Sequence, residues 1–546
     1  MAISTAEVTP PRRILAVVTV GRLTHAVPIL EICRVLHRRG HIIEFACLEG
    51  CQNIADPYPF ISKVHIIARA VDPIEDARIQ NAVDEADISS ANGRKGLLEC
   101  LMFFDSFWKE AFDTLDILMG SPERPDFILA DLLDHSCIDM MNKWHVPLAV
   151  HYPQMPWMFV PQKYIPGLPG FQRKLITSEN ASLWDRIRED MFALSLLFSM
   201  RHYGKWRAKM RKAAGAPPSP LMRKPNYLVF VNSCFGLEVP KDLPPLMTPI
   251  GPILSENYDP LGDELSSFLS SHHRVVYIAF GSHVKLSAWR IRAMIQGATS
   301  AMRSSDIDGV VWAMKIAKDG IQQLHLEQGP EPDSIDYQAI LTNSHSQWKF
   351  IPWAPQRAIL AHTSTRLFIT HCGAASTNEA TFHGVPMLAL PIYGDQIANS
   401  RRAAAAGVAL TLDKNAFTAH ELLEKMQFIL RDVDDSFARN VLRMKRIVTI
   451  TSKRKELAAD LIEEVLYDHE LRWECSIHDD EWKGRSYIEG LEEGFNGVGR
   501  ELRPMHLQTA DARMGWVKGN NWDIWFVYAS FVAAPFLVVK LLRSFW

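Results

Sequence analysis

Cysteine and blocks of like charge are both scarce in this sequence of 546 residues. The 8 cysteines are scattered, and the closest pair, Cys47 and Cys51, lacks the spacing of a redox or zinc motif. The formal net charge is only −3 and no long run of like charges occurs, so there is no electrostatic case for nucleic-acid binding. We therefore expect buried free thiols and no nucleic-acid partner.

Long apolar runs are also few, and the two candidates lie near the chain ends. Residues 14–20 follow two arginines but form too short a run for a signal peptide, so we expect a strand there and no cleavable signal peptide. Residues 524–539 carry no charge, and they approach the ~20 residues of a membrane-spanning helix only if Lys540 snorkels. We predict membrane association through an anchor at 524–542 and cytosolic domains before it, with an interfacial helix or a packed terminal helix as alternatives.

The first half of the chain alternates between strand and helix patterns. A strand at 14–20, a helix at 28–39 and a second strand from residue 41 form a βαβ unit, which implies a parallel sheet. Further strands are predicted at 127–130, 146–151 and 227–231, helices at 97–118 and 182–214, and a polar insertion or loop at 71–96.

The second half repeats this alternation. Its apolar runs lie at 275–280, 310–314, 348–351, 367–370, 387–392 and 408–412. Because single cores seldom exceed roughly 250–300 residues, we predict an α/β fold of two doubly wound, Rossmann-like domains. The predicted organisation is an N-terminal domain at 1–240, a proline-rich linker at 241–272, a C-terminal domain at 273–435, a long helix at 436–467 and a peripheral tail at 468–523.

The most informative segment runs from residue 353 to residue 396. Within it, a strand-like run is followed by the small-residue turn 371–376, which leads into a predicted helix. Such a turn exposes backbone N–H groups at the positive end of a helix, and His371 and Ser376 add a ring donor and a hydroxyl. The turn therefore suits a pyrophosphate.

Side chains around this turn suit the other parts of a nucleotide sugar. Trp353 offers a flat face for a base, and Gln356 offers an amide for a ribose or a uracil edge. Glu379 lies one helical turn further on, where a carboxylate can accept from ribose hydroxyls, and Asp395 with Gln396 can bind a sugar. Four candidates directly follow a predicted strand, where ligands gather in doubly wound folds: Ser282, Trp353, His371 and Asp395.

This segment closely resembles the donor-binding signature of the UDP-dependent glycosyltransferases of family 1, whose intervals it matches without a gap. The resemblance implies a GT-B fold, with the helix at 436–467 crossing back onto the first domain, and a UDP-sugar as co-substrate. It implies donor contacts from Ser282, Trp353, Ala354, Gln356, His371, Gly373, Ala375, Ser376, Glu379, Asp395 and Gln396. Plant members carry Trp-Asn where this chain has Ala374-Ala375, so backbone contacts should dominate there.

Sugar transfer also needs a general base, because an acceptor hydroxyl has a high pKa. His25 follows the first predicted strand after a short loop and precedes Pro28 by three residues. Asp131, at the carboxyl end of another predicted strand, can orient the imidazole and stabilise its charged form, with Asp134 as the competitor for this role. His25 and Asp131 match the base and its supporting aspartate in the resembled family.

The predicted chemistry requires no cofactor and no metal. No Asp-x-Asp element stands where it would place a divalent ion under a diphosphate, and His135, His145 and His151 lack the spacing of a metal site. We expect an inverting transfer of a hexose, with glucose favoured, to a small lipophilic acceptor such as a phenol, a sterol or another lipid. The alternatives are a non-catalytic nucleotide-sugar-binding protein and a UDP-sugar epimerase or hydrolase.

The acceptor class rests on the aromatic-rich N-terminal segments and on the apolar tail. The proline-rich stretch 151–170 contains Met155, Trp157, Met158 and Phe159. It is either a packed irregular loop, which we prefer for most of these residues, or an apolar wall of the acceptor site.

Overall fold

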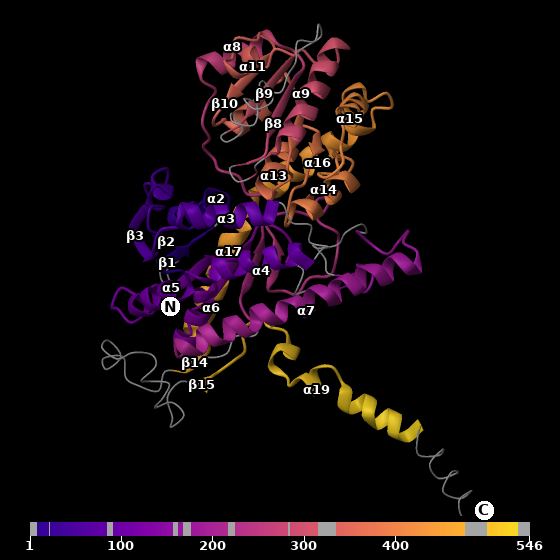
Figure 1. Cartoon of the computed structure of the whole chain (residues 1–546). Helices are drawn as coiled ribbons and strands as arrows, with labels where there is room; N and C mark the ends of the chain where they lie inside the picture. Colours follow the sequence, from indigo (N-terminus) through magenta and orange to yellow (C-terminus); the bar gives the residue numbers. More distant parts are fainter. Residues whose placement is uncertain are drawn as a thin grey trace, which may run out of the picture.

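Two parallel β-sheets organise the computed structural model, which describes residues 8–20, 22–84, 91–156, 162–167, 176–216, 224–281, 284, 286–314, 335–474 and 500–532 (Figure 1). The first sheet has the strand order β3-β2-β1-β4-β5-β6-β7, and the second has the order β10-β9-β8-β11-β12-β13. Each strand in both sheets runs parallel to its neighbours. The prediction of two doubly wound α/β domains is confirmed.

The strands are short apolar runs covered on both faces, which is the usual condition of parallel sheets. The four residues 14–17 of β1, for example, are fully buried. The first sheet consists of β1 (Arg13–Val17), β2 (Ile42–Leu48), β3 (Ile61–Ala68), β4 (Phe127–Asp131), β5 (Leu148–Tyr152), β6 (Leu228–Val231) and β7 (Met247–Pro249). The second consists of β8 (Val275–Ala279), β9 (Gly309–Ala313), β10 (Trp348–Ile351), β11 (Thr365–Thr370), β12 (Met387–Ala389) and β13 (Ala409–Thr411).

The helices of the N-terminal domain differ from the prediction in two places. They are α2 (Arg22–Arg38), α3 (Pro73–Asp84), α4 (Ala91–Asp105), α5 (Trp108–Met119), α6 (His135–Trp144) and α7 (Leu183–Ala213). The polar stretch 71–96, predicted as an insertion or loop, contains α3 and the start of α4. The single helix predicted at 97–118 is broken after Asp105, whose buried carboxylate is bound by His135 and Tyr203. Apolar periodicity continues across this break, so the sequence did not reveal it.

The segment predicted as a linker, 241–272, contains regular structure. It holds β7, which pairs with β6 at the edge of the first sheet, and helix α8 (Asp263–Ser271). The many prolines concealed β7 because a proline cannot donate to a ladder, yet Pro249 is tolerated at the end of an edge strand.

The C-terminal domain carries the helices that follow the strands of the second sheet. They are α9 (Ala288–Arg303), α11 (Tyr337–Leu341), α12 (Gln356–Ala361), α13 (Ala374–His383), α14 (Gln396–Ala405), α15 (Ala419–Arg431) and α16 (Ser436–Thr451). The predicted long helix at 436–467 is two helices, α16 and α17 (Lys455–Arg472), separated by the 3₁₀ turn η2 (Ser452–Arg454).

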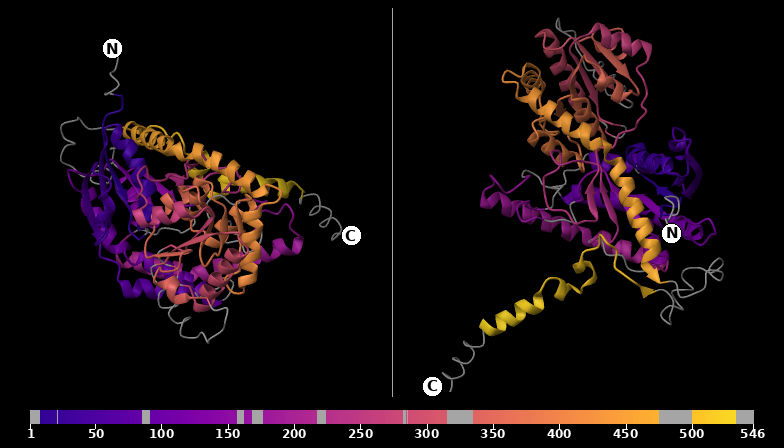
Figure 2. Two further views of the ribbon diagram at one scale, coloured as in Figure 1. Left: turned by 90° about the horizontal axis from the view of Figure 1, so that it is seen from above. Right: turned by 180° about the vertical axis from the view of Figure 1, so that it is seen from behind.

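Helices α16 and α17 connect the two domains (Figure 2). Val441, Met444 and Val448 of α16 belong to a core cluster of the second sheet. Ile462 and Leu466 of α17 belong instead to a core cluster of the first sheet. The chain therefore returns to the N-terminal domain at η2.

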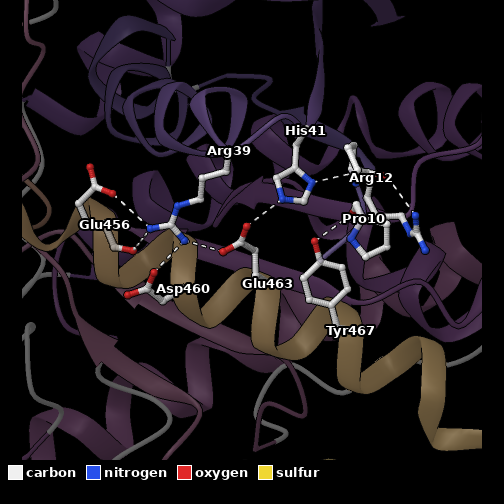
Figure 3. Close-up of polar contacts among 9 residues, drawn as sticks. Pro10, Arg12, Arg39, His41, Glu456, Asp460, Glu463 and Tyr467 are labelled. Carbon is white, nitrogen blue, oxygen red and sulfur yellow. Dashed lines mark hydrogen bonds and ion pairs between the residues drawn. The ribbon is translucent and has the colours of Figure 1, made fainter. Parts of the chain in front are cut away.

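Polar contacts fix α17 against the end of α2 and the neighbouring chain (Figure 3). The guanidinium of Arg39 contacts Asp460 at 2.7 Å and Glu463 at 2.5 Å. Glu463 also accepts from Nε2 of His41 at 3.0 Å, and the hydroxyl of Tyr467 donates to the carbonyl of Pro10 at 3.0 Å. Because α2 carries His25 near its start, this interface supports the helix that bears the predicted base.

Described residues beyond α17 also contact the N-terminal domain, before the last described helix projects away from it. Met505 packs in the core of the first sheet, and Lys224 contacts Asp511 at 2.7 Å. A helix over residues 522–532 then projects from the molecule (Figure 1). None of the helices in the described part of the chain is both long and apolar enough to cross a membrane. Residues 533–542 of the predicted anchor lie outside the described residues.

Candidate active site

His25 and Asp131 form a direct pair at the carboxyl edge of the first sheet. His25 lies in the first turn of α2, not in the loop that we predicted, and Asp131 is the last residue of β4. Nδ1 of His25 is 2.8 Å from Oδ2 of Asp131. Burial lowers the pKa of His25, but the charge and the hydrogen bond of Asp131 outweigh burial and raise that pKa above its usual 6.5. The pair can therefore accept a proton and hold it as an ion pair.

Asp134 does not contact His25. It precedes α6, and its Oδ1 accepts from the hydroxyl of Thr19 at 2.5 Å. Burial and the nearby charge of Asp131 raise the pKa of Asp134 well above its usual value. Of the two carboxyl groups considered in the sequence, the structure places Asp131 against the imidazole.

His151 is a second histidine beside Asp131, and the sequence offered no reason to select it. Its Nδ1 lies 3.8 Å from Oδ2 of Asp131 and its side chain is fully buried. Neither ring nitrogen has a hydrogen-bond partner among the described residues. Burial lowers the pKa of His151, so a neutral ring flanks the Asp131 carboxylate. His151 ends a predicted apolar run, where a buried histidine cannot be distinguished from a packing residue.

Gln356 connects the residues expected to bind the nucleoside. Its amide nitrogen donates to Oε2 of Glu379 at 2.7 Å and to the hydroxyl of Ser376 at 3.2 Å. Its amide oxygen accepts from the hydroxyl of Tyr277 at 3.3 Å. Burial raises the pKa of Glu379, and Gln356 opposes this effect. Tyr277 was not predicted, because it lies within an apolar strand and resembles a core residue.

Trp353 and Ala354 lie between β10 and Gln356 in the chain. Both follow β10, and Trp353 is 64% exposed. A large exposed indole in this position leaves a flat apolar face for a base.

The turn after β11 brings a helix end and an imidazole together. Helix α13 begins after Gly373, and no side chain caps its first turn. A Cβ at Gly373 would lie 2.7 Å from Nε2 of His371, and a Cβ at Gly281 would lie 3.1 Å from the same atom. The absence of a side chain at both glycines therefore leaves the space that the His371 ring occupies. The backbone N–H groups of Ala375 and its neighbours at the start of α13 provide a positive site for an anion. Ser282 lies outside the described residues.

Asp395 and Gln396 lie at the start of α14, and the side chains of both accept hydrogen bonds from neighbouring residues. Oδ2 of Asp395 accepts from Asn399 at 2.8 Å. The amide oxygen of Gln396 accepts from the backbone N–H of Ile392 at 2.9 Å, which leaves its amide nitrogen for a ligand. Burial raises the pKa of Asp395, and the charge of Asp395 contributes to the raised pKa of His25. The expected sugar-binding residue of one domain thus lies within electrostatic range of the predicted base of the other.

Residues from both domains line a recess beside α13. Gln154, Ser233 and Glu238 come from the N-terminal domain, and Ala374 and Asn399 come from the C-terminal domain. The predicted acceptor segment is only partly placed. Met155 packs in the core of the first sheet, whereas Trp157, Met158 and Phe159 lie outside the described residues. In the described ranges, no group of three or more His, Cys, Asp or Glu side chains is arranged to hold a metal ion.

The fold and the site define a two-domain enzyme of the GT-B type that uses a nucleotide sugar. The model of the family "UDP-glucoronosyl and UDP-glucosyl transferase" matches residues 176–451. A UDP-glycosyltransferase of Aspergillus ustus, stmC, is 51% identical over 554 residues and covers 100% of both chains. The chain belongs to the UDP-glycosyltransferase family.

More distant relatives extend this similarity. The human UDP-glucuronosyltransferase 3A1 is 25% identical over 77% of this chain and 78% of its own. A UDP-glucose:anthocyanidin 3-O-glucosyltransferase solved with UDP superposes with a TM-score of 0.54 at 18% identity, covering 83% of this chain and 99% of that one. At this identity the superposition supports the fold alone.

Proposed function

We propose that this enzyme transfers glucose from UDP-glucose to a hydroxyl of a small lipophilic acceptor, with inversion and without a metal ion. The observation that carries the proposal is the 2.8 Å contact between His25 and Asp131 at the carboxyl edge of the first sheet. The charge of Asp395, on the other domain, also contributes to the raised pKa of His25. With Nδ1 engaged by Asp131, Nε2 is the ring nitrogen that takes the acceptor proton.

The donor would lie along the C-terminal domain. The base would stack on Trp353, and the ribose hydroxyls would bind the Gln356–Glu379 pair, which is already held together at 2.7 Å. The diphosphate would bind the start of α13 beside His371, where backbone N–H groups and the ring neutralise its charge. In this proposal, the start of α13 and His371 stabilise the departing UDP in place of a divalent ion.

The reaction is then a direct displacement. The acceptor oxygen forms a bond to the anomeric carbon as its proton moves to His25, and the bond between that carbon and the β-phosphate oxygen breaks. UDP leaves with the bonding electron pair. Attack from the face opposite UDP converts an α-linked donor into a β-glycoside.

The test is to incubate the full-length protein with UDP-glucose and a panel of phenols, sterols and other lipophilic alcohols, and to analyse the products by mass spectrometry. We expect a hexose mass added to at least one acceptor, with a β anomeric coupling by NMR. An α product would contradict inversion. Free glucose or an epimerised donor without any glycoside would instead support the hydrolase or epimerase alternative.

A further inference from the structure

Helix α7 exposes a row of large apolar side chains and buries several charged ones. The helix spans Leu183–Ala213. Its buried face combines apolar and aromatic residues with charged ones: Phe192, Ala193, Leu196, Tyr203, Glu189, Arg207 and Arg211. Its outer face carries large apolar side chains, of which Trp184 is 59% exposed and Phe198 is 71% exposed. Surface helices normally carry polar side chains on their outer face. An exposed apolar surface of this size marks an interaction site.

Buried ion pairs hold α7 in this orientation. The two terminal nitrogens of the Arg211 guanidinium, Nη1 and Nη2, donate to Asp139 of α6, at 2.7 and 2.5 Å. Arg207 lies 3.3 Å from Asp105 of α4, which also accepts from the hydroxyl of Tyr203 at 2.5 Å. Removing one partner of a buried pair is strongly destabilising, so rotation of α7 to bury its apolar side is opposed.

The exposed apolar residues form one continuous stripe. They recur at intervals of three and four residues, which places them on one side of a helix. We call this set the α7 stripe: Trp184, Ile187, Met191, Leu194 and Phe198. Guanidinium groups flank both of its ends, since Arg188 lies over the Trp184 ring at 5.3 Å and Arg201 lies over the Phe198 ring at 5.7 Å.

The same side of α7 continues as a basic surface. The following turns expose the α7 lysines, defined as Lys205, Lys209 and Lys212. Two acids border the stripe. Asp190 accepts from the backbone N–H of Gly167 at 2.9 Å, and Asp185 lies 3.9 Å from the guanidinium of Arg188. One helix thus presents aromatic and aliphatic side chains followed by three lysines that form no ion pair with another described residue.

We infer that α7 docks on an anionic lipid surface, with the α7 stripe in the headgroup region and the α7 lysines on acidic headgroups. Apolar burial and attraction to anionic lipid act together in helices that lie on a membrane. A second copy of the chain is the alternative occupant of the stripe, and the test below distinguishes it from a lipid surface. The helix over 522–532 projects on the same side of the molecule as the start of α7 in every view, and its Phe526 and Phe531 are exposed (Figures 1 and 2).

Vesicle flotation of the full-length protein tests the docking. Binding to vesicles of phosphatidylcholine with phosphatidylserine should fall about tenfold or more in Ile187→Glu/Met191→Glu/Leu194→Glu. Lys205→Gln/Lys209→Gln/Lys212→Gln should lose the preference for phosphatidylserine, by about 10- to 100-fold. Phe428→Glu is the matched control, because Phe428 is equally exposed on α15 of the other domain and should have no effect.

A local probe separates α7 from any contribution of the chain end. An environment-sensitive fluorophore on Met191→Cys should shift to the blue when phosphatidylserine vesicles are added, whereas the same fluorophore on Phe428→Cys should not. An unshifted probe at position 191 would overturn the proposal, even if the protein floats. So would a concentration-dependent dimer that is abolished by the triple Glu variant, because a second copy would then be the occupant.

Discussion

The proposed donor side and the proposed proton-transfer side of the site are built in different ways. Apart from Ser282, the donor candidates come from one continuous stretch, 353–396, which contains the turns after β10, β11 and β12. In the sheet, β9 and β8 lie between β10 and β11. The proton-transfer pair joins residues 106 positions apart on α2 and β4. Local spacing therefore reveals most donor candidates in the sequence, whereas the pairing of His25 with Asp131 depends on how the first sheet is assembled. Substitutions on the donor side should therefore change UDP affinity, whereas substitution of His25 should change kcat.

The largest effect is expected from His25→Ala. Loss of the general base should lower kcat by about 10²- to 10⁴-fold, because the acceptor hydroxyl keeps its proton. Steady-state rates with saturating UDP-glucose measure this effect. His135→Ala is the matched control, since His135 also pairs with a buried aspartate, Asp105 at 2.7 Å, outside the site. Equal losses in both variants would mean that the effect is structural.

A smaller effect is expected from Gly373→Ala. The added methyl would lie 2.7 Å from Nε2 of His371 and would displace the ring from the phosphate turn. We expect UDP affinity to fall about 10- to 100-fold, the equivalent of overpacking by ~1–3 kcal/mol. Gly262→Ala is the control, because Gly262 also precedes a helix in an extended conformation and a Cβ there meets nothing within 4 Å. Calorimetric titration with UDP distinguishes the two variants.

Gln356→Ala should weaken UDP binding by about tenfold. The substitution removes the donor at 2.7 Å from Glu379 and leaves a half-buried carboxylate without that partner, at a cost of ~1–3 kcal/mol. Gln347→Ala, which alters an amide elsewhere in the same domain, should leave the affinity unchanged. If kcat fell in Gln356→Ala while UDP affinity did not, Gln356 would belong to the reacting side.

The smallest change is a displacement of the pH profile. In the wild type, kcat/KM should fall on the acid side as His25 is protonated, with an apparent pKa above 6.5. Asp131→Asn removes the charge that raises this pKa and leaves burial, which lowers it. The acid limb should therefore move to lower pH, while the plateau rate decreases. A limb that stays in place would show that Asp131 does not set the protonation of the base.

The sequence predicted much of this site because strands, turns and motif spacing are local properties. The positions of Trp353, His371 and Asp395 after their strands followed from apolar runs alone. The break at Asp105, the strand at 247–249 and the approach of His151 to Asp131 did not, because each depends on a tertiary partner. The exposed apolar stripe of α7 was hidden for the same reason: helical periodicity shows which residues share a face, and only packing decides which face is inside.

The most direct test of whether donor binding and reaction are separate uses the His25→Ala variant. Its affinity for UDP is measured by calorimetric titration, and its kcat is measured in parallel. We predict a UDP dissociation constant close to that of the wild type together with the loss of kcat, because all the proposed donor contacts lie on the C-terminal domain. A large loss of UDP affinity in this variant, or turnover that persists in it, would contradict the account.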